Sequence, residues 1–397
     1  MKQETSHRPL ELLKELSNAR HPMQIGIPKE DQRTEKRLAF TPEAVDMLTE
    51  AGHEVVFEEG AALGIHYSDS DYSEAGATIT NERASVFACD LIFKIAPPTL
   101  EEIEWMKKRA TVLSMLQMPN ISIETIKAMA AKQIHAVGYE LMSPDGYRFP
   151  VRDSISEIEG AAAISVVSEL LSNEKGGKGI LLGGIPGVSP TEVVIIGAGV
   201  AGTVAAQAAL SLGATVKVFD NDIDKLRKLQ RQVKTPVFTS VFQPNVLVNT
   251  FESADVVIGV MRYIDDSVRY VISEDVIRTM KKSSVLIDLR INQGGCFETT
   301  CFLPTDHPPV FEKDGILHYC VPNLSSRVAR TTSMALSNIF ISIVLRMSEL
   351  GGITAIASID SGFRSGCYMY SGKLVNSYMA KYFNLPANDI GLFLSVF

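Results

Sequence analysis

The stretch TEVVIIGAGVAGTVAAQAALSLGATVKVFD, residues 191–220, decides the fold of this 397-residue chain. An apolar run leads into Gly197, Gly199 and Gly202, and an alanine-rich segment and a second apolar run ending at Asp220 follow. The spacing GxGxxG is a weak signal alone. The order strand, glycine turn, helix, strand and terminal acid within 30 residues is specific for a dinucleotide-binding unit.

Each glycine of this turn has a physical reason. Gly197 allows the tight turn after the strand, Gly199 lets the backbone approach a pyrophosphate, and Gly202 permits close packing of helix on strand. The pyrophosphate would meet the free N–H groups and the positive dipole end of the helix. The three glycines are therefore predicted to bind a cofactor.

The acid that ends the second strand selects between two cofactors. Asp220 can accept hydrogen bonds from a ribose 2′-hydroxyl and would repel a 2′-phosphate, which favours NAD over NADP. Lys217 and Lys225 flank the acid and leave some tolerance of NADP open. We count Lys225 among the candidate cofactor contacts.

Two later apolar runs, 254–261 and 283–295, are predicted to be further parallel strands of the same sheet. Ligands of such sheets bind outside the carboxyl ends of the strands. This rule places Met261, Asn292 and the turn 320–324 near the nicotinamide.

The part before residue 150 shows the same alternation of strand-like and helical segments. Apolar runs at 23–28, 88–96 and 110–116 are separated by helical patterns, and each run is nearly continuous, as in parallel sheets covered by helices on both faces. A short amphipathic helix is predicted over 9–20. The sequence therefore predicts an α/β protein with two doubly wound domains, and helices near 156–173 and 327–350 are candidates for the connections between them.

Composition excludes several classes of protein. With 38 basic and 46 acidic residues the net charge is −8, which disfavours a nucleic-acid binder. No run approaches the roughly 18 apolar residues of a membrane span, and the N-terminus lacks the pattern of a signal peptide. Five cysteines without a CxxC pair favour a reducing cytoplasm, and no metal site is predicted.

Six motifs follow one another over about residues 23–350, in the order in which they occur in a known protein family. Together they resemble the alanine dehydrogenase family, with which the proton-translocating nicotinamide nucleotide transhydrogenases share a related domain. The motifs are IGIPKE, EKRLAFTPEAV, KGGKGILLGGIPGV, GAGVAG, NQGGCFETT and HYCVPNL.

The resemblance implies an NAD-dependent oxidative deamination, in which L-alanine and water give pyruvate and ammonia and hydride passes to the nicotinamide. It implies a Rossmann NAD domain, residues 151–327, inserted in a split substrate domain formed by residues 1–150 and 328–397. The partners would be a small amino or keto acid and further copies of the chain, because the family is typically hexameric.

The substrate residues of the family can be matched one at a time. Arg37 in EKRLAFTP matches the arginine that binds the substrate carboxylate, and a guanidinium suits that group. Lys94 in LIFKIAPP matches the substrate lysine. Gln117 stands where the family has a catalytic histidine, and Asn292 stands where it has a catalytic aspartate. An amide cannot act as an ordinary general acid or base.

The resemblance also adds cofactor contacts. Ser156 in SISEIEG matches a family residue near the cofactor, Asn323 in VPNL matches one beside the nicotinamide, and Ser240 matches the adenosine side more loosely.

Other residues could supply the missing proton transfer. Lys94 is the best candidate, because burial near Arg37 would favour its neutral form. His135 and His318 are alternatives, although a lone histidine is more often a satisfied core residue. Asp288 precedes the expected catalytic position and points elsewhere in a regular strand.

Three functions remain open at this stage. The chain is an alanine dehydrogenase, a weakly active or inactive relative that binds NAD(H), or a dehydrogenase of another amino or keto acid. The pair Gln117 and Asn292 separates the first from the second, whereas Arg37, Lys94 and Asp220 point to retained binding in both.

Overall fold

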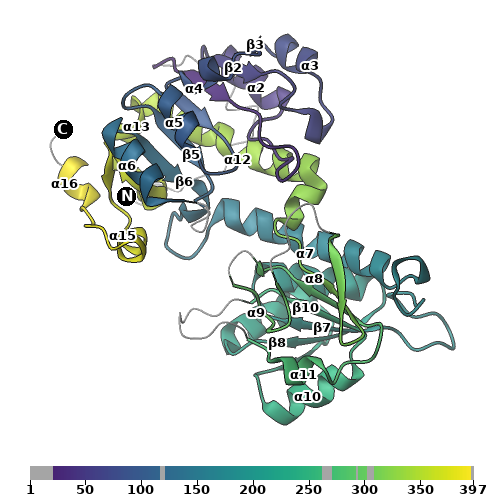
Figure 1. The fold of residues 1–397 in the computed structure, drawn as a ribbon. Coiled ribbons are helices and arrows are strands. Elements are labelled where there is room, and N and C mark those ends of the chain that lie inside the picture. The colour runs from purple at the N-terminus through teal and green to yellow at the C-terminus, as the bar shows by residue number, and fades with distance from the viewer. Residues whose placement is uncertain (1–20, 117–120, 262–270, 292–293, 302–307, 395–397) are drawn as a thin grey trace. The chain divides into compact units, whose positions relative to one another are not determined.

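The computed structural model describes residues 21–116, 121–261, 271–291, 294–301 and 308–394. The chain divides into two compact units. Unit 1 comprises Met1–Ser154 and Ala329–Phe397, and unit 2 comprises Ile155–Val328 (Figure 1). The chain therefore passes twice from one unit to the other. The first passage lies inside helix α7 (Pro150–Leu170), and the second lies at the start of helix α12 (Ala329–Leu350).

Unit 2 is built on a seven-stranded sheet in the order β12-β13-β11-β10-β7-β8-β9. Counted from β7, this is the order 3-2-1-4-5-6 of doubly wound dinucleotide-binding sheets, with β12 added antiparallel at one edge. The strands are β7 (Glu192–Ile196), β8 (Thr215–Phe219), β9 (Phe238–Ser240), β10 (Val256–Gly259), β11 (Val285–Asp288), β12 (Val310–Lys313) and β13 (Ile316–Tyr319).

Both faces of this sheet are covered, which explains its continuous apolar strands. In β7, Val193 and Ile195 pack with α7 and with the alanines of α8 (Val200–Ser211). Val194 and Ile196 face the opposite way, toward Phe251 of α10 (Pro244–Ser253). Helix α9 (Ile223–Val233) lies on the α8 side, and α11 (Glu274–Ile277) lies on the α10 side.

Unit 1 is built on an eight-stranded sheet in the order β15-β14-β6-β5-β4-β1-β2-β3. The six parallel strands repeat the winding of unit 2, and the C-terminal segment adds two antiparallel strands beside β6. The strands are β1 (Gln24–Ile27), β2 (Glu54–Glu58), β3 (Thr78–Thr80), β4 (Leu91–Phe93), β5 (Thr111–Ser114), β6 (His135–Gly138), β14 (Cys367–Tyr370) and β15 (Lys373–Leu374).

Helices surround the unit 1 sheet. They are α2 (Pro42–Glu50), α3 (Asp69–Glu74), α4 (Arg83–Phe87), α5 (Leu100–Trp105), α6 (Ile123–Ala131), α12, α13 (Ile353–Ile359), α14 (Ser361–Gly366), α15 (Ser377–Phe383) and α16 (Ile390–Leu394). The segment Leu324–Leu350 is the one helix of the described residues long and apolar enough to cross a membrane. Within it, Phe340 is fully buried and its ring contacts those of Phe40, Phe93 and Tyr139, which is the packing of a core helix.

The predicted fold class is confirmed, since two parallel-dominated α/β sheets form. The expected strands 254–261 and 283–295 contain β10 and β11, and these pair in parallel. The antiparallel edges were not predicted from the sequence. The predicted helix over 9–20 lies outside the described residues.

Candidate active site

The glycine turn lies where the strand order of unit 2 reverses. It follows β7, which pairs with β8 on one side and β10 on the other. A Cβ atom on Gly197 would lie 2.9 Å from Val260 Cγ2 and 3.1 Å from Met261, both just after β10. Met261 therefore lies beside the glycine turn. Ligands of doubly wound sheets bind at this reversal, outside the carboxyl ends of the strands.

The three glycines differ in what requires them. Gly197 has φ +115°, a conformation that favours glycine, and a Cβ atom on Gly202 would lie 1.9 Å from the Gly197 carbonyl oxygen. Gly199 is the N-cap of α8 with φ −71°, and apart from Gly199 and its two chain neighbours no atom of the described protein lies within 4 Å of its ideal Cβ position. The fold itself therefore does not require glycine at position 199, whereas the close approach of a ligand to the backbone would.

Asp220 holds the glycine turn from the end of β8. Its Oδ2 accepts the Ala198 N–H at 2.8 Å, its Oδ1 accepts the Asp222 N–H at 2.9 Å, and the residue is 2% exposed. A carboxylate oxygen has lone pairs for more than one donor. Asp220 is thus fixed beside the turn and keeps acceptor capacity for a hydroxyl group.

Two more candidate cofactor residues lie near Asp220. The Asp220 N–H donates to the Ser240 carbonyl oxygen at 3.2 Å, so the ends of β8 and β9 are adjacent. Lys225 lies in the first turn of α9, where Asp222 is the N-cap, and its Nζ is 3.7 Å from the Asp222 carboxylate. Lys225 is exposed at this surface.

A polar cluster lies near the carboxyl ends of β10, β11 and β13 in unit 2. Ser325 Oγ donates to Asn323 Oδ1 at 3.3 Å and to Glu159 Oε1 at 3.4 Å. Arg290 lies 3.8 Å from the Glu159 carboxylate and donates from Nε to the Val260 carbonyl oxygen at 3.0 Å. Ser156 is buried on α7, three residues before Glu159. The structure thus brings Asn323 and the Ser156 turn of α7 to one group of contacts.

Asp288 organises the loop that carries position 292. Its carboxylate accepts the N–H groups of Arg290 at 2.8 Å and Cys296 at 2.7 Å and the Thr300 hydroxyl at 2.7 Å. Burial raises the pKa of Asp288, and the hydrogen bonds partly oppose this shift. Its side chain points into the loop, in agreement with the sequence argument. Asn292 itself lies outside the described residues.

Glu30 lies where the strand order of unit 1 reverses, between β1 and β4. Its Oε1 accepts the backbone N–H of Ile95 at 2.5 Å and of Ala96 at 3.3 Å, so it joins the ends of these strands. Burial raises the pKa of Glu30, and Lys94 opposes the shift. The carboxylate lies 4.0 Å from Lys94 Nζ.

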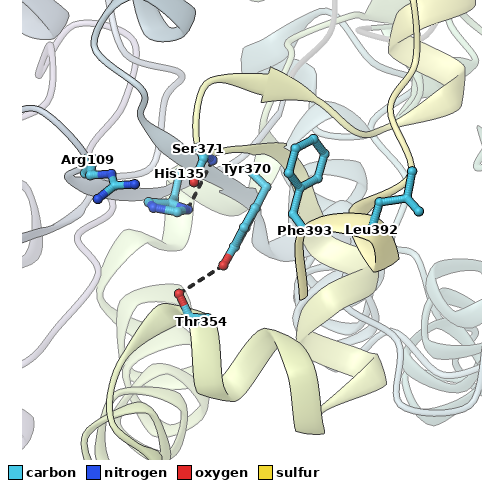
Figure 2. A pocket seen from close by; sticks show the side chains of 7 residues that line it. All are labelled: Arg109, His135, Thr354, Tyr370, Ser371, Leu392 and Phe393. Carbon is cyan, nitrogen blue, oxygen red and sulfur yellow. Dashed lines mark hydrogen bonds between the residues drawn. The ribbon is translucent and has the colours of Figure 1, made fainter. Parts of the chain in front are cut away.

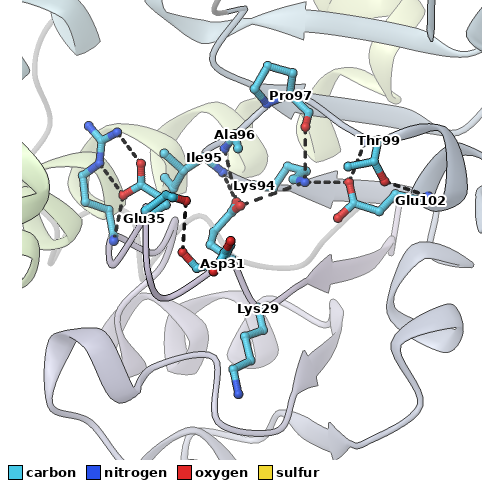
Figure 3. Close-up of polar contacts among 12 residues, drawn as sticks. Lys29, Asp31, Glu35, Lys94, Ile95, Ala96, Pro97, Thr99 and Glu102 are labelled. Carbon is cyan, nitrogen blue, oxygen red and sulfur yellow. Dashed lines mark hydrogen bonds and ion pairs between the residues drawn. The ribbon is translucent and has the colours of Figure 1, made fainter. Parts of the chain in front are cut away.

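Lys94 is 3% exposed and directly paired. Its Nζ donates to Glu102 Oε2 at 2.7 Å (Figure 3), and Glu102 Oε1 accepts from Arg83 at 2.5 Å. Glu102 also closes the capping box that begins α5, because it accepts the Thr99 N–H. Burial near Arg37 was expected to favour a neutral Lys94, whereas the structure pairs its Nζ with the Glu102 carboxylate.

Arg37 is likewise buried and paired. Its guanidinium donates to both oxygens of Glu35, at 2.8 and 2.6 Å, and to Met115 Sδ at 3.7 Å. Tyr139, after β6, lies beside the backbone of Lys94, since its hydroxyl donates to the Lys94 carbonyl oxygen at 3.3 Å. Burial raises the pKa of Tyr139 well above its usual value, and the nearby Arg37 opposes this. Arg37 and Lys94 are therefore grouped around Tyr139.

The remaining candidates for proton transfer lie in different surroundings. Gln117 lies outside the described residues. His318 is fully buried, with Nδ1 on the Ile316 carbonyl at 2.9 Å and Nε2 on the Thr299 hydroxyl at 2.8 Å, so both ring nitrogens have structural partners. His135 lies at the amino end of β6, whereas Tyr139 follows the carboxyl end.

Sequence reasoning missed the acids behind the cations, which are Glu30, Glu35 and Glu102, and it missed Arg290. A signal for the acids was present, because a lysine on an apolar strand is rarely buried without a partner. No comparable signal marked Arg290.

Two domains of one known protein family match the sequence of this chain. Residues 26–159 match the family described as alanine dehydrogenase/PNT, N-terminal domain, and residues 163–377 match alanine dehydrogenase/PNT, C-terminal domain. The alanine dehydrogenase of Staphylococcus saprophyticus is 34% identical over 93% of this chain and 99% of its own length. That of Bacillus subtilis is 33% identical over 90% and 94%.

Solved structures give the same result. A structure titled L-alanine dehydrogenase superposes with a TM-score of 0.85 at 29% identity and covers 91% of this chain and 99% of its own. A transhydrogenase from Sinorhizobium meliloti, at 23% identity, shares the fold with a TM-score of 0.75 over 89% and 99%. With matched domains that span most of both units, the chain belongs to the alanine dehydrogenase/PNT family.

Proposed function

We propose that this protein is an NAD-dependent alanine dehydrogenase, which converts L-alanine, water and NAD⁺ to pyruvate, ammonium, NADH and a proton. The observation that carries the cofactor is Gly199, where the fold leaves open the space that a side chain would fill, at the N-terminus of α8. The relatives at 33–34% identity that carry the name alanine dehydrogenase support the reaction.

The glycine turn and the first N–H groups of α8 would hold the cofactor diphosphate. Asp220, already fixed by two backbone N–H groups, would accept from the adenosine ribose, with Lys225 and Ser240 nearby. Ser156, Met261 and Asn323 would lie toward the nicotinamide, as would Asn292. When bound, NAD⁺ supplies the hydride acceptor.

Arg37 and Lys94 would bind the substrate. A guanidinium offers parallel N–H groups to a carboxylate, and an ammonium group can polarise a carbonyl oxygen. The Glu35 carboxylate holds Arg37 in place, and Glu102 holds Lys94. Both cations are therefore positioned before the substrate arrives.

A second candidate function is that of a weakly active or inactive NAD(H)-binding relative, because the two positions expected to transfer protons carry amides. Gln117 and Asn292 replace the family's histidine and aspartate, and loss of a general acid or base removes roughly 10²–10⁴-fold in rate per function. A dehydrogenase of another amino or keto acid is also consistent with the paired cations.

A spectrophotometric screen for NADH formation across amino acids, and for NADH consumption with keto acids plus ammonia, tests the proposal. We expect turnover of L-alanine, greatest at alkaline pH where the deprotonated amine is plentiful. NADH binding measured on the same preparation is the control. Binding of NADH without turnover of any substrate would favour the inactive relative, and no binding of either redox form would overturn both.

The double variant Gln117→His with Asn292→Asp tests whether proton transfer limits the rate. We expect faster alanine turnover than in the wild type. An unchanged rate would show that another residue transfers the proton or that the substrate differs.

We also propose a homo-oligomer, hexameric by family resemblance. Leu181, Ile185 and Val188 expose 70%, 55% and 61% of their surface on one loop of unit 2, a grouping typical of an interface. Sedimentation of the wild type against Ile185→Asp with Val188→Asp would detect it, and a wild-type monomer would contradict it.

We place the protein in the cytoplasm, acting on a small molecule and neither on nucleic acid nor at a membrane. All five cysteines are free thiols, four of them buried, as suits a reducing compartment. Cell fractionation would test this location.

A further inference from the structure

A pocket of about 490 Å³ opens on unit 1 beside the strands that its C-terminal segment adds (Figure 2). This volume is within the range of small-molecule sites. The pocket is lined by Arg109, His135, Thr354, Tyr370, Ser371, Leu392 and Phe393.

The pocket is distinct from the substrate residues. His135 is the first residue of β6, whereas Lys94 and Tyr139 follow the carboxyl ends of β4 and β6. Tyr139 lies four positions after His135, and at ~3.3 Å per strand residue this places them about 13 Å apart, at opposite ends of β6.

One wall of the pocket carries N–H donors. Arg109 is exposed, and its guanidinium has no hydrogen-bond or ion-pair partner within the described parts of the chain. His135 Nδ1 accepts the Ser371 N–H at 3.4 Å, so the proton of the neutral ring is on Nε2. Burial first, and Arg109 second, lower the pKa of His135 to about 4, which keeps the ring neutral near pH 7.

The other wall is apolar and aromatic. The rings of Tyr370 and Phe393 have centroids 6.4 Å apart, and Leu392 beside Phe393 is 68% exposed. The Tyr370 hydroxyl donates to Thr354 Oγ1 at 2.9 Å, and the His135 ring meets the Tyr370 ring edge-to-face at 4.7 Å. The Tyr370 ring is therefore held in place as a fixed surface.

We propose that this pocket binds a small monocarboxylate with an aromatic or branched apolar body. The guanidinium of Arg109 faces the carboxylate, and Tyr370, Leu392 and Phe393 cover the apolar body. A single cation suits a single negative charge. The site is independent of the proposed reaction, because it shares no residue with the groups around Lys94 or the glycine turn.

Calorimetric titration of the full chain with phenylacetate tests the proposal, with phenethylamine as a probe that has the same ring and the opposite charge. We expect saturable one-to-one binding of phenylacetate and none of phenethylamine. Arg109→Gln should weaken phenylacetate at least about tenfold, because it removes the charge-assisted contact. Leu392→Asp, a change at an exposed position, should weaken it through charge repulsion.

Lys108→Gln is the matched control, since it removes a neighbouring exposed charge that does not line the pocket, and binding should stay within about twofold. An excess of L-alanine separates this site from the proposed substrate site and should leave phenylacetate binding unchanged. The proposal is overturned if phenylacetate does not bind, if Arg109→Gln binds it like the wild type, or if L-alanine displaces phenylacetate. Each readout is valid whether or not alanine is turned over.

Discussion

Gly199 and Gly202 lie three residues apart at the start of α8, and glycine is needed at the two positions for different reasons. At position 202 a Cβ atom would overlap the Gly197 carbonyl, so the protein's own backbone forbids it. At position 199 the ideal Cβ position is open and φ is ordinary. One glycine therefore serves the packing of helix on strand, and the other leaves space for a ligand.

This difference predicts separable effects of two alanine variants. Gly202→Ala should lower the free energy of unfolding by about 1–3 kcal/mol through overpacking and also weaken NADH binding. Gly199→Ala should cost less than about 1 kcal/mol of stability, as an N-cap change, yet weaken NADH at least about tenfold. Denaturant unfolding and fluorescence titration measure the two quantities. Wild-type NADH affinity in Gly199→Ala would remove the main support for the cofactor site.

The pairing of Lys94 with Glu102 gives a pH-dependent prediction. Burial raises the pKa of Glu102, but Lys94, Thr99 and Arg83 outweigh it, so the net pKa is below its usual value of 4.5. The stabilisation is therefore present above pH 4.5 and is lost as the pH falls through the lower folded-state pKa. Glu102→Gln should destabilise by about 3 kcal/mol at pH 7, because it leaves a buried cation, and by much less in acid.

The control is Asp90→Asn, whose carboxylate pairs with Lys107 at the surface at 2.9 Å. We expect a loss below about 1 kcal/mol there. An equal loss in both variants, or a Glu102→Gln effect that persists in acid, would argue against the buried ion pair.

At the scale of helices and strands, the sequence predicted the elements whose pairing follows from the order of strands and helices along the chain. The apolar runs of β7, β10 and β11 and the turn before α8 were predictable, because each lies in a strand–helix–strand series that can form only a parallel sheet. The edge formed by β14 and β15 was not, because its partner β6 is distant in the sequence and a four-residue apolar run carries no direction. Arg37 and Lys94 were identified through the family resemblance, whereas their acid partners were missed although Glu35 lies two residues from Arg37 and Glu102 lies eight residues from Lys94.

The pairing of β6 with β14 has a consequence that can be measured. It buries His135, whose folded-state pKa of about 4 lies below the usual 6.5. A lowered folded pKa means that stability is full above pH 6.5 and declines as the pH falls toward 4, by at most about 3 kcal/mol. His135→Gln should reduce this decline in urea unfolding at pH 7 and pH 4.5. An unchanged decline would show that the ring is not buried as neutral imidazole.

At the scale of the whole molecule, two similarly wound units are joined by two chain passages, and only unit 2 carries the glycine turn. A ligand that binds the folded state alone stabilises by mass action, about 2.7 kcal/mol at a concentration of 100 Kd. Saturating NADH should therefore raise the unfolding temperature of the transition that includes unit 2 by about 5–10 °C. Scanning calorimetry with NADH, and with nicotinamide alone as control, measures this shift, and its absence would contradict cofactor binding.

The late arrival of β14 also affects how the protein is made. On the ribosome, β6 emerges about 230 residues before its antiparallel neighbour, and at about 5–20 residues per second this is roughly 10–50 s of translation. During that time one side of β6 offers unpaired backbone groups to any other nascent chain. The inserted unit 2 is complete in sequence by residue 328, so it can finish folding while the first-made unit still waits for its last strands.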